Sequence, residues 1–358
     1  MRGVNWLGDA VMTTPALLQL REALPDTHLA LLTHEKLADL WVGHTAVDEV
    51  ITFAAKEGVF TVTRRLRAKS FDTALVLPNS LRSGLEVRLA GIPRRIGYAG
   101  GWRGWLLTQA VPWRTNVTRM RKRSVAEVRQ LTADSSLAAS EVATPSPESH
   151  HLFHYLHLVA TLGAKLVPIA PLVTVTNAEV AAVKAKFNLP DSLLIGLNAG
   201  AEYGPAKRWP AERFIATAKA LQARLNCSFV IFGGPADARL AADIASVFAP
   251  SSSIITNLAG RTSLRELCAV FRACRVVLTN DTGPMHVAAA AGTRVVALFG
   301  STSAELTGPG LPGDARHVLL SGKVPCAPCF LRECPVDFRC MKSLTAERVV
   351  EAVIRAAA

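Results

Sequence analysis

Val276-Val277-Leu278-Thr279-Asn280-Asp281-Thr282-Gly283-Pro284-Met285-His286 is the stretch that decides the fold. An apolar run typical of a buried strand ends in a polar turn, and a helix of small residues begins at once. Backbone N–H groups at such a helix start point toward the carboxyl edge of the sheet, where the helix dipole favours an anion. Thr282 adds a hydroxyl donor, and Gly283 lets a ligand approach the backbone. The stretch predicts an anion site, although Asp281 or Thr282 would also fit as a plain N-cap.

Strand-like apolar runs and helical patterns alternate on both sides of this stretch. Such alternation predicts an α/β fold of parallel, doubly wound sheets, and the length of 358 residues suggests two domains. In the second half we expect strands at 193–198, 228–232, 254–257, 275–279 and 294–299, and helices at 211–224, 237–248, 263–273 and 283–291. In the first half we expect strands at 28–32, 49–53, 73–77 and 95–98, and helices at 10–23, 36–42, 59–69 and 81–90.

The predicted domains are 1–167 and 168–345, followed by a terminal helix over 346–358, because prolines interrupt any helix near 165–177. The first domain begins unusually. A doubly wound domain normally has a full buried strand before its first helix, yet only about seven residues precede Gly8. We therefore expect a short first strand, or one that starts upstream of Met1. Residues 115–150, a basic run followed by Ser-, Ala- and Pro-rich sequence, are interpreted as a mobile surface insertion of the first domain.

Composition narrows the class of function. The formal net charge of +12 suggests an anionic partner, such as nucleic acid, a membrane surface or a phosphorylated substrate, or simple solubility. Aromatic residues are not interleaved with the basic ones, so nothing supports a nucleic-acid partner. No run of 18 apolar residues occurs, and Asp9 interrupts the apolar region that a signal peptide would need. We expect a soluble, cytoplasmic protein.

A second strand-to-helix loop carries adjacent cations. The loop runs from Asn198 to Pro210 and includes Lys207-Arg208 directly before the expected helix. These cations could neutralise a diphosphate at the same sheet edge, or form an ordinary exposed pair. At the front of the chain, Gly8-Asp9 places a carboxylate at another strand-to-helix turn. Asp9 fits a general base for an acceptor hydroxyl and fits equally well as a first-turn acid favoured by the helix dipole.

Three further patterns bear on possible cofactors and metals. The literal GxGxxG at Gly308–Gly313 follows no strand and contains prolines, which argues against a nicotinamide-binding dehydrogenase. Four cysteines, Cys326, Cys329, Cys334 and Cys340, lie within fifteen residues. Such clusters in intracellular proteins bind metal more often than they form disulfides, so we consider a structural zinc site alongside free thiols or a disulfide. The spacing of His150, His151, His154 and His157 would also allow a metal, but a solvated or substrate-facing helix is favoured.

Several motifs together resemble glycosyltransferase family 9, the heptosyltransferases, over nearly the whole chain. The segments that carry the resemblance are Arg2–Thr13, Leu77–Ser80, Gly91–Tyr98, Tyr203–Pro210, Thr279–Ala289, and the tail Cys326–Cys329, Cys334-Pro335 and Arg339–Met341. The Asn5-Trp6 pair and the cysteine tail favour the type II branch. The resemblance implies a GT-B fold, two Rossmann-like domains facing a central cleft, and an inverting reaction that requires no metal.

The resemblance also implies the substrates. The donor would be ADP-L-glycero-D-manno-heptose, and the acceptor a phosphorylated, heptosylated Kdo2-lipid A inner core at the inner face of the inner membrane. Asp9 would be the base, and Lys207 would hold the donor diphosphate. The remaining implied donor-binding residues are Arg208, Gly260, Arg261, Thr262, Asp281, Thr282, Gly283 and His286. The implied acceptor-binding residues are Arg64, Arg65, Asn79, Arg82, Arg94 and Arg95.

Three alternatives stay open. Another family 9 transferase, such as heptosyltransferase I or III or a related sugar transferase, is the first alternative, although Asn5-Trp6 and the cysteine tail favour type II. A GT-B-fold nucleotide-sugar epimerase would share the architecture, but it needs further acid and base residues that we do not identify. A nucleotide-sugar-binding or RNA-binding module without enzymatic activity would not need Asp9.

Overall fold

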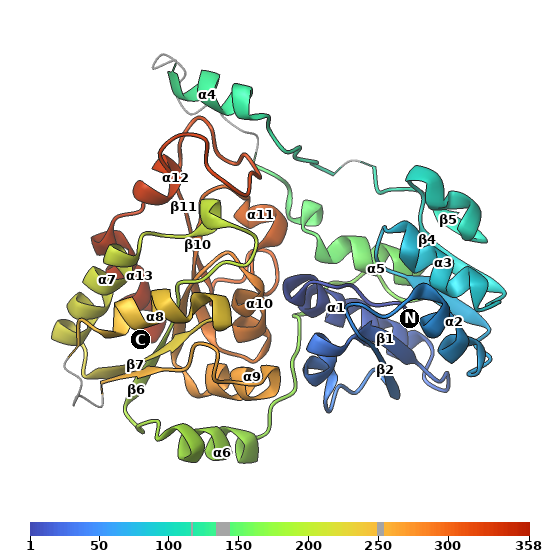
Figure 1. The fold of residues 1–358 in the computed structure, drawn as a ribbon, viewed down its shortest axis with the longest axis horizontal. Helices are drawn as coiled ribbons and strands as arrows, with labels where there is room; N and C mark the ends of the chain where they lie inside the picture. Colours follow the sequence, from blue (N-terminus) through green and yellow to red (C-terminus); the bar gives the residue numbers. More distant parts are fainter. Residues whose placement is uncertain (116, 134–143, 249–253) are drawn as a thin grey trace. The chain divides into compact units, whose positions relative to one another are not determined.

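The structure is a computed structural model that describes residues 1–115, 117–133, 144–248 and 254–358 (Figure 1). It divides into two compact units. The first contains Met1–Val117 and His151–Thr174, and the second contains Thr118–His150 and Val175–Ala358. Among the described residues, no helix is both long enough and apolar enough to cross a lipid bilayer.

The second unit is built on one parallel sheet of six strands in the order β11-β10-β9-β6-β7-β8. The strands are β6 (Leu193–Asn198), β7 (Cys227–Phe232), β8 (Ile255–Asn257), β9 (Val276–Asn280), β10 (Arg294–Phe299) and β11 (Val318–Ser321). Every residue of β7 and β9 is buried, as expected for a parallel sheet covered on both faces. The predicted parallel α/β fold is confirmed here.

Helices cover both faces of this sheet (Figure 1). On one face, α7 (Ala211–Arg224), α8 (Ala238–Ala245) and α13 (Ala346–Ala357) share a core with alternate residues of the strands. On the other, α9 (Leu264–Ala273) packs beside α10 (Gly283–Ala290). The other described helices of this unit are α4 (Val125–Ala133), η3 (Pro147–Ser149), α6 (Asn177–Phe187), η4 (Pro205–Lys207), η5 (Pro235–Asp237), α11 (Ala304–Thr307) and α12 (Arg339–Lys342).

The first unit has a parallel sheet in two parts, β1-β2 and β3-β4-β5. The strands are β1 (Ala30–His34), β2 (Glu49–Phe53), β3 (Thr73–Val76), β4 (Arg94–Tyr98) and β5 (Gln109–Val111). The helices are α1 (Leu7–Ala23), η1 (Glu35–Trp41), α2 (Val59–Arg67), α3 (Leu81–Leu89), η2 (Gly101–Leu106) and α5 (Leu152–Ala160).

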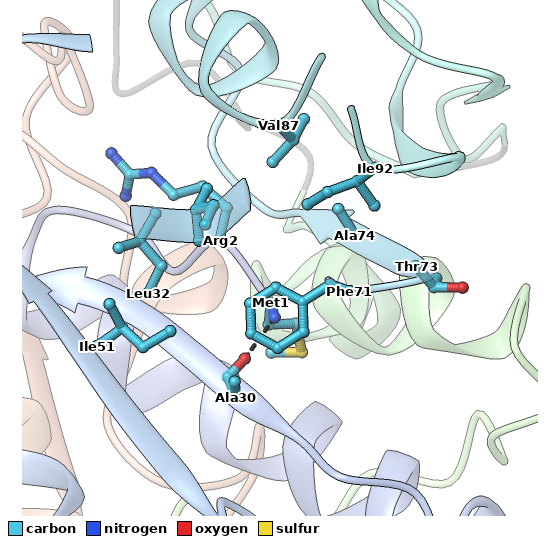
Figure 2. Close-up of a pocket in the computed structure, with 11 residues that line it drawn as sticks. Met1, Arg2, Ala30, Leu32, Ile51, Phe71, Thr73, Ala74, Val87 and Ile92 are labelled. Carbon is cyan, nitrogen blue, oxygen red and sulfur yellow. Dashed lines mark hydrogen bonds between the residues drawn. The ribbon is translucent and has the colours of Figure 1, made fainter. Parts of the chain in front are cut away.

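Residues 1–3 join the two parts of this sheet. Arg2 N–H donates to Leu75 O at 2.8 Å, and Gly3 N–H donates to Leu32 O at 2.8 Å. The α-amino group of Met1 is buried and donates to Ala30 O, as Figure 2 shows, and burial lowers its pKa to about 6. Residues 1–3 therefore lie between β1 and β3, with Arg2 as the bridging residue to both, and the alternatives of a short first strand or one that starts upstream of Met1 both stay predictions.

A buried ion pair connects residues 1–3 to α3. Arg2 Nε lies 2.8 Å from a Glu86 carboxylate oxygen, and both side chains are almost fully buried. The Arg2 guanidinium also lies 4.4 Å from the ring centroid of Phe53 on β2. Since breaking a buried pair leaves an uncompensated charge, the pair ties α3 to the centre of the sheet.

Residues 118–150 differ from the prediction, because they belong with the second unit and contain a helix. Val128 of α4 packs in a cluster with Cys326 and Cys329. Arg123 donates its backbone N–H to Cys329 O at 3.0 Å and a guanidinium N–H to Pro325 O at 2.8 Å. The prediction that this segment is a surface insertion of the first domain is therefore wrong for its described residues from 118 on. Residues 116 and 134–143 of that predicted insertion lie outside the described residues.

Candidate functional site

The polar turn after β9 lies at the carboxyl edge of the second sheet and is rigidly held. Asn280 is fully buried, and its side-chain amide donates to Ala199 O at 2.8 Å. Its side-chain carbonyl accepts the Trp209 N–H at 3.1 Å. One side chain thus joins the loop after β6 to the start of α7, which brings the two predicted donor-binding loops together.

Lys207, Asp281 and Thr302 meet at this edge. The Lys207 ammonium lies 2.6 Å from a carboxylate oxygen of Asp281, and the Thr302 hydroxyl donates to the same oxygen at 2.5 Å. The side chain of Lys207 is 14% exposed and that of Asp281 is 4% exposed. Lys207 therefore keeps solvent access while a nearly buried carboxylate fixes its position.

The start of α10 offers an anion site of limited strength. Thr282 occupies the N-cap position, but its side chain makes no capping hydrogen bond, so the plain capping alternative is not what the structure adopts. Pro284 has no N–H, and Met285 N–H donates back to Thr282 O at 3.0 Å. The first turn therefore offers few N–H groups to an anion, whereas the Lys207 ammonium beside Asp281 carries a full positive charge.

The other predicted donor residues line the same edge of the sheet. Arg208 Nη2 lies 3.4 Å from an Asp237 carboxylate oxygen. Gly260 follows β8 with a φ of +72°, which favours glycine, and its N–H donates to Gly233 O at 2.9 Å. Arg261 Nη1 donates to Asn257 O at 3.1 Å, and Thr262 follows it in the loop. His286 is buried within α10.

Asp9 is in the first turn of α1, in the first unit, with a tyrosine as its partner. The Tyr155 side chain, from α5, is hydrogen-bonded to the Asp9 side chain. Burial raises the pKa of Tyr155 well above its ordinary value, and the charge of Asp9 raises it further. The phenol therefore stays protonated near neutral pH, so it donates the hydrogen bond and Asp9 accepts it.

Aromatic rings extend this cluster from Tyr155 to the end of β4. The Tyr98 hydroxyl donates to His154 O at 2.8 Å and lies 2.9 Å from His157 Nδ1. The Trp113 ring stacks on the Tyr98 ring with centroids 4.2 Å apart and planes 4° from parallel. Burial lowers the pKa of His157, with a smaller contribution from the charge of Arg114. The histidine-rich segment therefore contributes hydrogen bonds and ring contacts to the region of Asp9.

The predicted acceptor residues lie in three parts of the first unit. Asn79 follows β3 at the carboxyl edge, and Arg82 in α3 pairs with Glu86 at 2.8 Å. Arg65 pairs with Glu57 at 2.6 Å, and Arg64 beside it is exposed. Arg94 and Arg95 lie at the opposite, amino end of β4. Their guanidinium groups bond to Gln109 and to the backbone carbonyls of Leu106, Ile92 and Pro93. The structure does not bring these two arginines together with Asn79.

The four clustered cysteines line one small cavity in the second unit, of about 10 Å³. All are free thiols, and burial raises the pKa of Cys326, Cys329 and Cys340, the last to about 12. Across the described ranges, no three His, Cys, Asp or Glu side chains are placed to hold a metal ion. The thiols converge without forming a ligand set, so the zinc site stays a prediction.

Sequence reasoning missed Tyr155 and Thr302. Tyr155 lies between two predicted metal-ligand candidates, but nothing local indicates that it reaches Asp9, 146 positions away in the chain. Thr302 is three residues after β10, and its position directly after a strand of the same parallel sheet was a usable signal.

Comparison with known proteins identifies the family. The model of glycosyltransferase family 9 (heptosyltransferase) matches residues 59–338. This chain belongs to glycosyltransferase family 9. The transferase is 31% identical to lipopolysaccharide heptosyltransferase 2 of Salmonella typhimurium over 329 residues, which cover 89% of this chain and 86% of that protein.

Solved structures agree with this assignment. The transferase matches the structure of E. coli ADP-heptose LPS heptosyltransferase II with a TM-score of 0.77 and 26% identity, over 99% of this chain and 97% of that chain. E. coli heptosyltransferase WaaC with ADP matches with a TM-score of 0.65 over the full length of both chains, at 19% identity. The two α/β units therefore have the fold of GT-B heptosyltransferases, and the predicted fold class and enzyme class are confirmed.

Proposed function

We propose that this transferase moves L-glycero-D-manno-heptose from ADP-heptose to the heptosylated Kdo2-lipid A inner core, the reaction of heptosyltransferase II. The observation that carries the donor half is the Lys207–Asp281 pair, with an ammonium 2.6 Å from its carboxylate at the carboxyl edge of the sheet. An ammonium that keeps solvent access can shift to a diphosphate when one binds. The relatives that carry the name heptosyltransferase 2 support this donor and acceptor.

The spacing of the donor residues suits a nucleotide sugar. Gly260 follows β8, whereas Asp281 follows β9, and β7 and β6 lie between them. Three steps between adjacent parallel strands amount to about 14 Å, a span that an adenosine diphosphate can bridge. We place the adenine beside Gly260–Thr262 and the diphosphate beside Lys207 and Gly283, with Asp281 and His286 toward the heptose.

Asp9 then acts on the acceptor. As the acceptor hydroxyl attacks the anomeric carbon, Asp9 accepts its proton, and the bond from that carbon to the diphosphate breaks with inversion. Tyr155 donates a hydrogen bond to Asp9, which favours the ionised carboxylate that a base requires. Lys207 and the start of α10 stabilise the charge that develops on the departing ADP.

We further propose that transfer needs no metal cofactor and takes place at the cytoplasmic face of the inner membrane. Lys207 can supply the positive charge at the diphosphate. The net charge of +12 suits a peripheral enzyme at an anionic lipid surface that presents a phosphorylated glycolipid. A structural zinc ion among Cys326, Cys329, Cys334 and Cys340 would serve stability rather than chemistry, and metal analysis of the purified chain tests for it.

The test is ADP release from ADP-heptose, followed with and without heptosylated Kdo2-lipid A in buffer containing EDTA. We expect saturable release that depends on the acceptor and is unaffected by EDTA. Release that ignores the acceptor, or acceptor-dependent release from other nucleoside diphosphate sugars only, would contradict the proposed donor and reaction. Loss of acceptor-dependent release in EDTA would contradict metal independence.

A further inference from the structure

A cavity of about 460 Å³ lies in the first unit, at the carboxyl edge of its sheet. This volume is in the range of small-molecule sites. The cavity follows the ends of β3 and β4, and it is lined by Asn79, Leu81, Ala99, Gly100, Gly101, Arg103 and Trp113. Of these, only Asn79 was predicted from sequence to touch a substrate.

Arg103 is a buried cation in this lining. It is 3% exposed, and none of the ion pairs in the described part of the chain involves it. Its guanidinium donates to Tyr98 O at 2.8 Å from Nη2 and at 3.3 Å from Nε, and to Pro78 O from Nη1. Burial lowers its pKa. Burying a charge without a counter-charge is costly, so a group that recovers this cost is expected nearby.

The sequence around Arg103 is shaped to hold it there. A Cβ on Gly97 of β4 would lie 3.1 Å from Arg103 Nη2, so the strand has a glycine where the guanidinium packs. A guanidinium has five N–H groups. Three are occupied by the carbonyls of Tyr98 and Pro78, which leaves two, one on Nη1 and one on Nη2. One carboxylate can accept hydrogen bonds from two N–H groups of the same guanidinium.

The other walls suit a sugar. The indole of Trp113 supplies an aromatic surface, and the amide of Asn79 can both donate to and accept from hydroxyl groups. Gly101 has a φ of +53°, and a Cβ there would meet nothing within 4 Å, so this side of the cavity stays open. The cavity therefore combines a cation, an amide and an aromatic face, which together select an acidic sugar over a neutral one.

The cavity also lies close to the base. Trp113 stacks on Tyr98, and Tyr155 lies near enough to Tyr98 and Asp9 that both raise its pKa. Trp113, Tyr98, Tyr155 and Asp9 are therefore successive neighbours by contact or charge influence, all within the first unit.

We propose that this cavity binds a carboxylate-bearing sugar of the acceptor, with the carboxylate on Arg103 and the ring against Trp113. The proposal rests on the proposed function, since the acceptor core is built on Kdo, which is such a sugar. Arg103 then acts by fixing where the acceptor lies relative to Asp9.

The experiment compares two acceptors in the full-length enzyme: heptosylated Kdo2-lipid A, and the same molecule with its Kdo carboxylates converted to carboxamides. With the wild-type chain, we expect the acceptor KM to rise roughly 10- to 100-fold for the carboxamide, the range of a lost charged hydrogen bond. The KM for ADP-heptose should not change. Equal KM values for the two acceptors would overturn the proposal without any substitution in the protein.

Variants then assign the effect to Arg103. In Arg103→Gln, the carboxylate and carboxamide acceptors should have equal, high KM values. Arg67→Gln is the matched control, because Arg67 is exposed and its guanidinium also donates to a backbone carbonyl, that of Leu89. If Arg103→Gln weakens both acceptors by the same factor, Arg103 is only structural and the proposal fails. If no acceptor supports ADP release by the wild-type chain, the proposed function fails instead.

Discussion

The sheets of the two units differ most at their centres. In the second unit the central strand β6 is six residues long and pairs along its length with β7, and over four residues with β9. In the first unit, residues 1–3 lie between β1 and β3 and connect them through the single bridging residue Arg2. The centre of the second sheet is therefore stabilised by a continuous hydrogen-bonded ladder. The centre of the first is stabilised by the hydrogen bonds of residues 1–3 and the buried Arg2–Glu86 ion pair.

This difference extends to the functional residues. At the edge of the second sheet, Asn280, Lys207 and Asp281 are locked by contacts among loops that directly follow strands. In the first unit, Asp9 is hydrogen-bonded to Tyr155, which comes from a helix that returns to the unit after residues 118–150. We infer that the donor half is organised by its sheet, and that the acceptor half is organised by helix packing.

The largest effect is expected at Asp9. Asp9→Ala should lower kcat by about 10²- to 10⁴-fold, because the attacking hydroxyl loses its base. ADP affinity, measured by calorimetry, should stay nearly unchanged, because Asp9 and the donor residues belong to different units. Unchanged turnover would exclude Asp9 as the base.

Lys207 tests the other half of the comparison. Lys207→Met should lower kcat by about 10²- to 10³-fold and weaken ADP binding, because the diphosphate loses its main cation. It also leaves the 4% exposed carboxylate of Asp281 without its ammonium partner, so the second unit should lose stability. Lys219→Met, an exposed lysine on α7, is the matched control. Equal ADP affinity in the two variants would remove Lys207 from the donor site.

Tyr155→Phe removes the hydrogen bond from α5 to Asp9 and leaves the Asp9 carboxylate in place. Loss of the hydrogen bond should lower kcat by roughly tenfold and move the acidic limb of the pH–rate profile to higher pH, because donors favour the ionised carboxylate. Tyr98→Phe removes a hydroxyl that donates to His154 O and lies beside His157 Nδ1, so its acidic limb should move less than that of Tyr155→Phe. An identical profile for wild type and Tyr155→Phe would show that Tyr155 does not position the base.

His44 makes the first unit sensitive to acid. Burial lowers the pKa of His44 to about 4, below the ordinary 6.5, so the folded state disfavours the charged ring. The stability that the neutral His44 ring contributes to the fold is complete above pH 6.5. It is lost as pH falls toward 4, by up to about 3 kcal/mol in the free energy of unfolding. Denaturant unfolding of wild type and His44→Gln from pH 7.5 to 4 should show a steeper decline in the wild type. Parallel declines would remove His44 as the cause.

The smallest effect is expected when residues are added ahead of Met1. Adding an Ile-Val pair ahead of Met1 extends the strand between β1 and β3, and should raise the thermal midpoint of the first unit by a few degrees, on the order of 1 kcal/mol. A Gly-Gly extension is the control, since it adds the same backbone with poor strand propensity. If the two extensions have the same midpoint, strand length does not limit this sheet.

The second sheet was predictable because its strands are continuous apolar runs. Strands 193–198 and 294–299 were predicted with their observed bounds, since burial on both faces leaves a clear signal. Helix α6 was missed although Thr176 and Glu179 form a capping box that is readable in the sequence. The three-residue β5 and the edge strand β11 are too short or too exposed to give a distinct pattern.

Prediction of the site followed the same division. Lys207 and Asp281 were found because each follows a strand, and parallel strands end at one edge. Tyr155 and Arg103 were not found, because their roles depend on tertiary contacts that leave no local pattern. The prediction that 115–150 is an insertion of the first domain was wrong for the same reason, since the place of 118–150 in the second unit depends on α4 packing against the cysteine segment near the other end of the chain.

The most direct test of the central claim is the mass of the product. The purified enzyme is given ADP-heptose together with Kdo2-lipid A that carries either no heptose or one heptose. We predict that only the acceptor with one heptose gains the mass of a single further heptose. Transfer to the acceptor without heptose alone, or no transfer to either, would contradict this account.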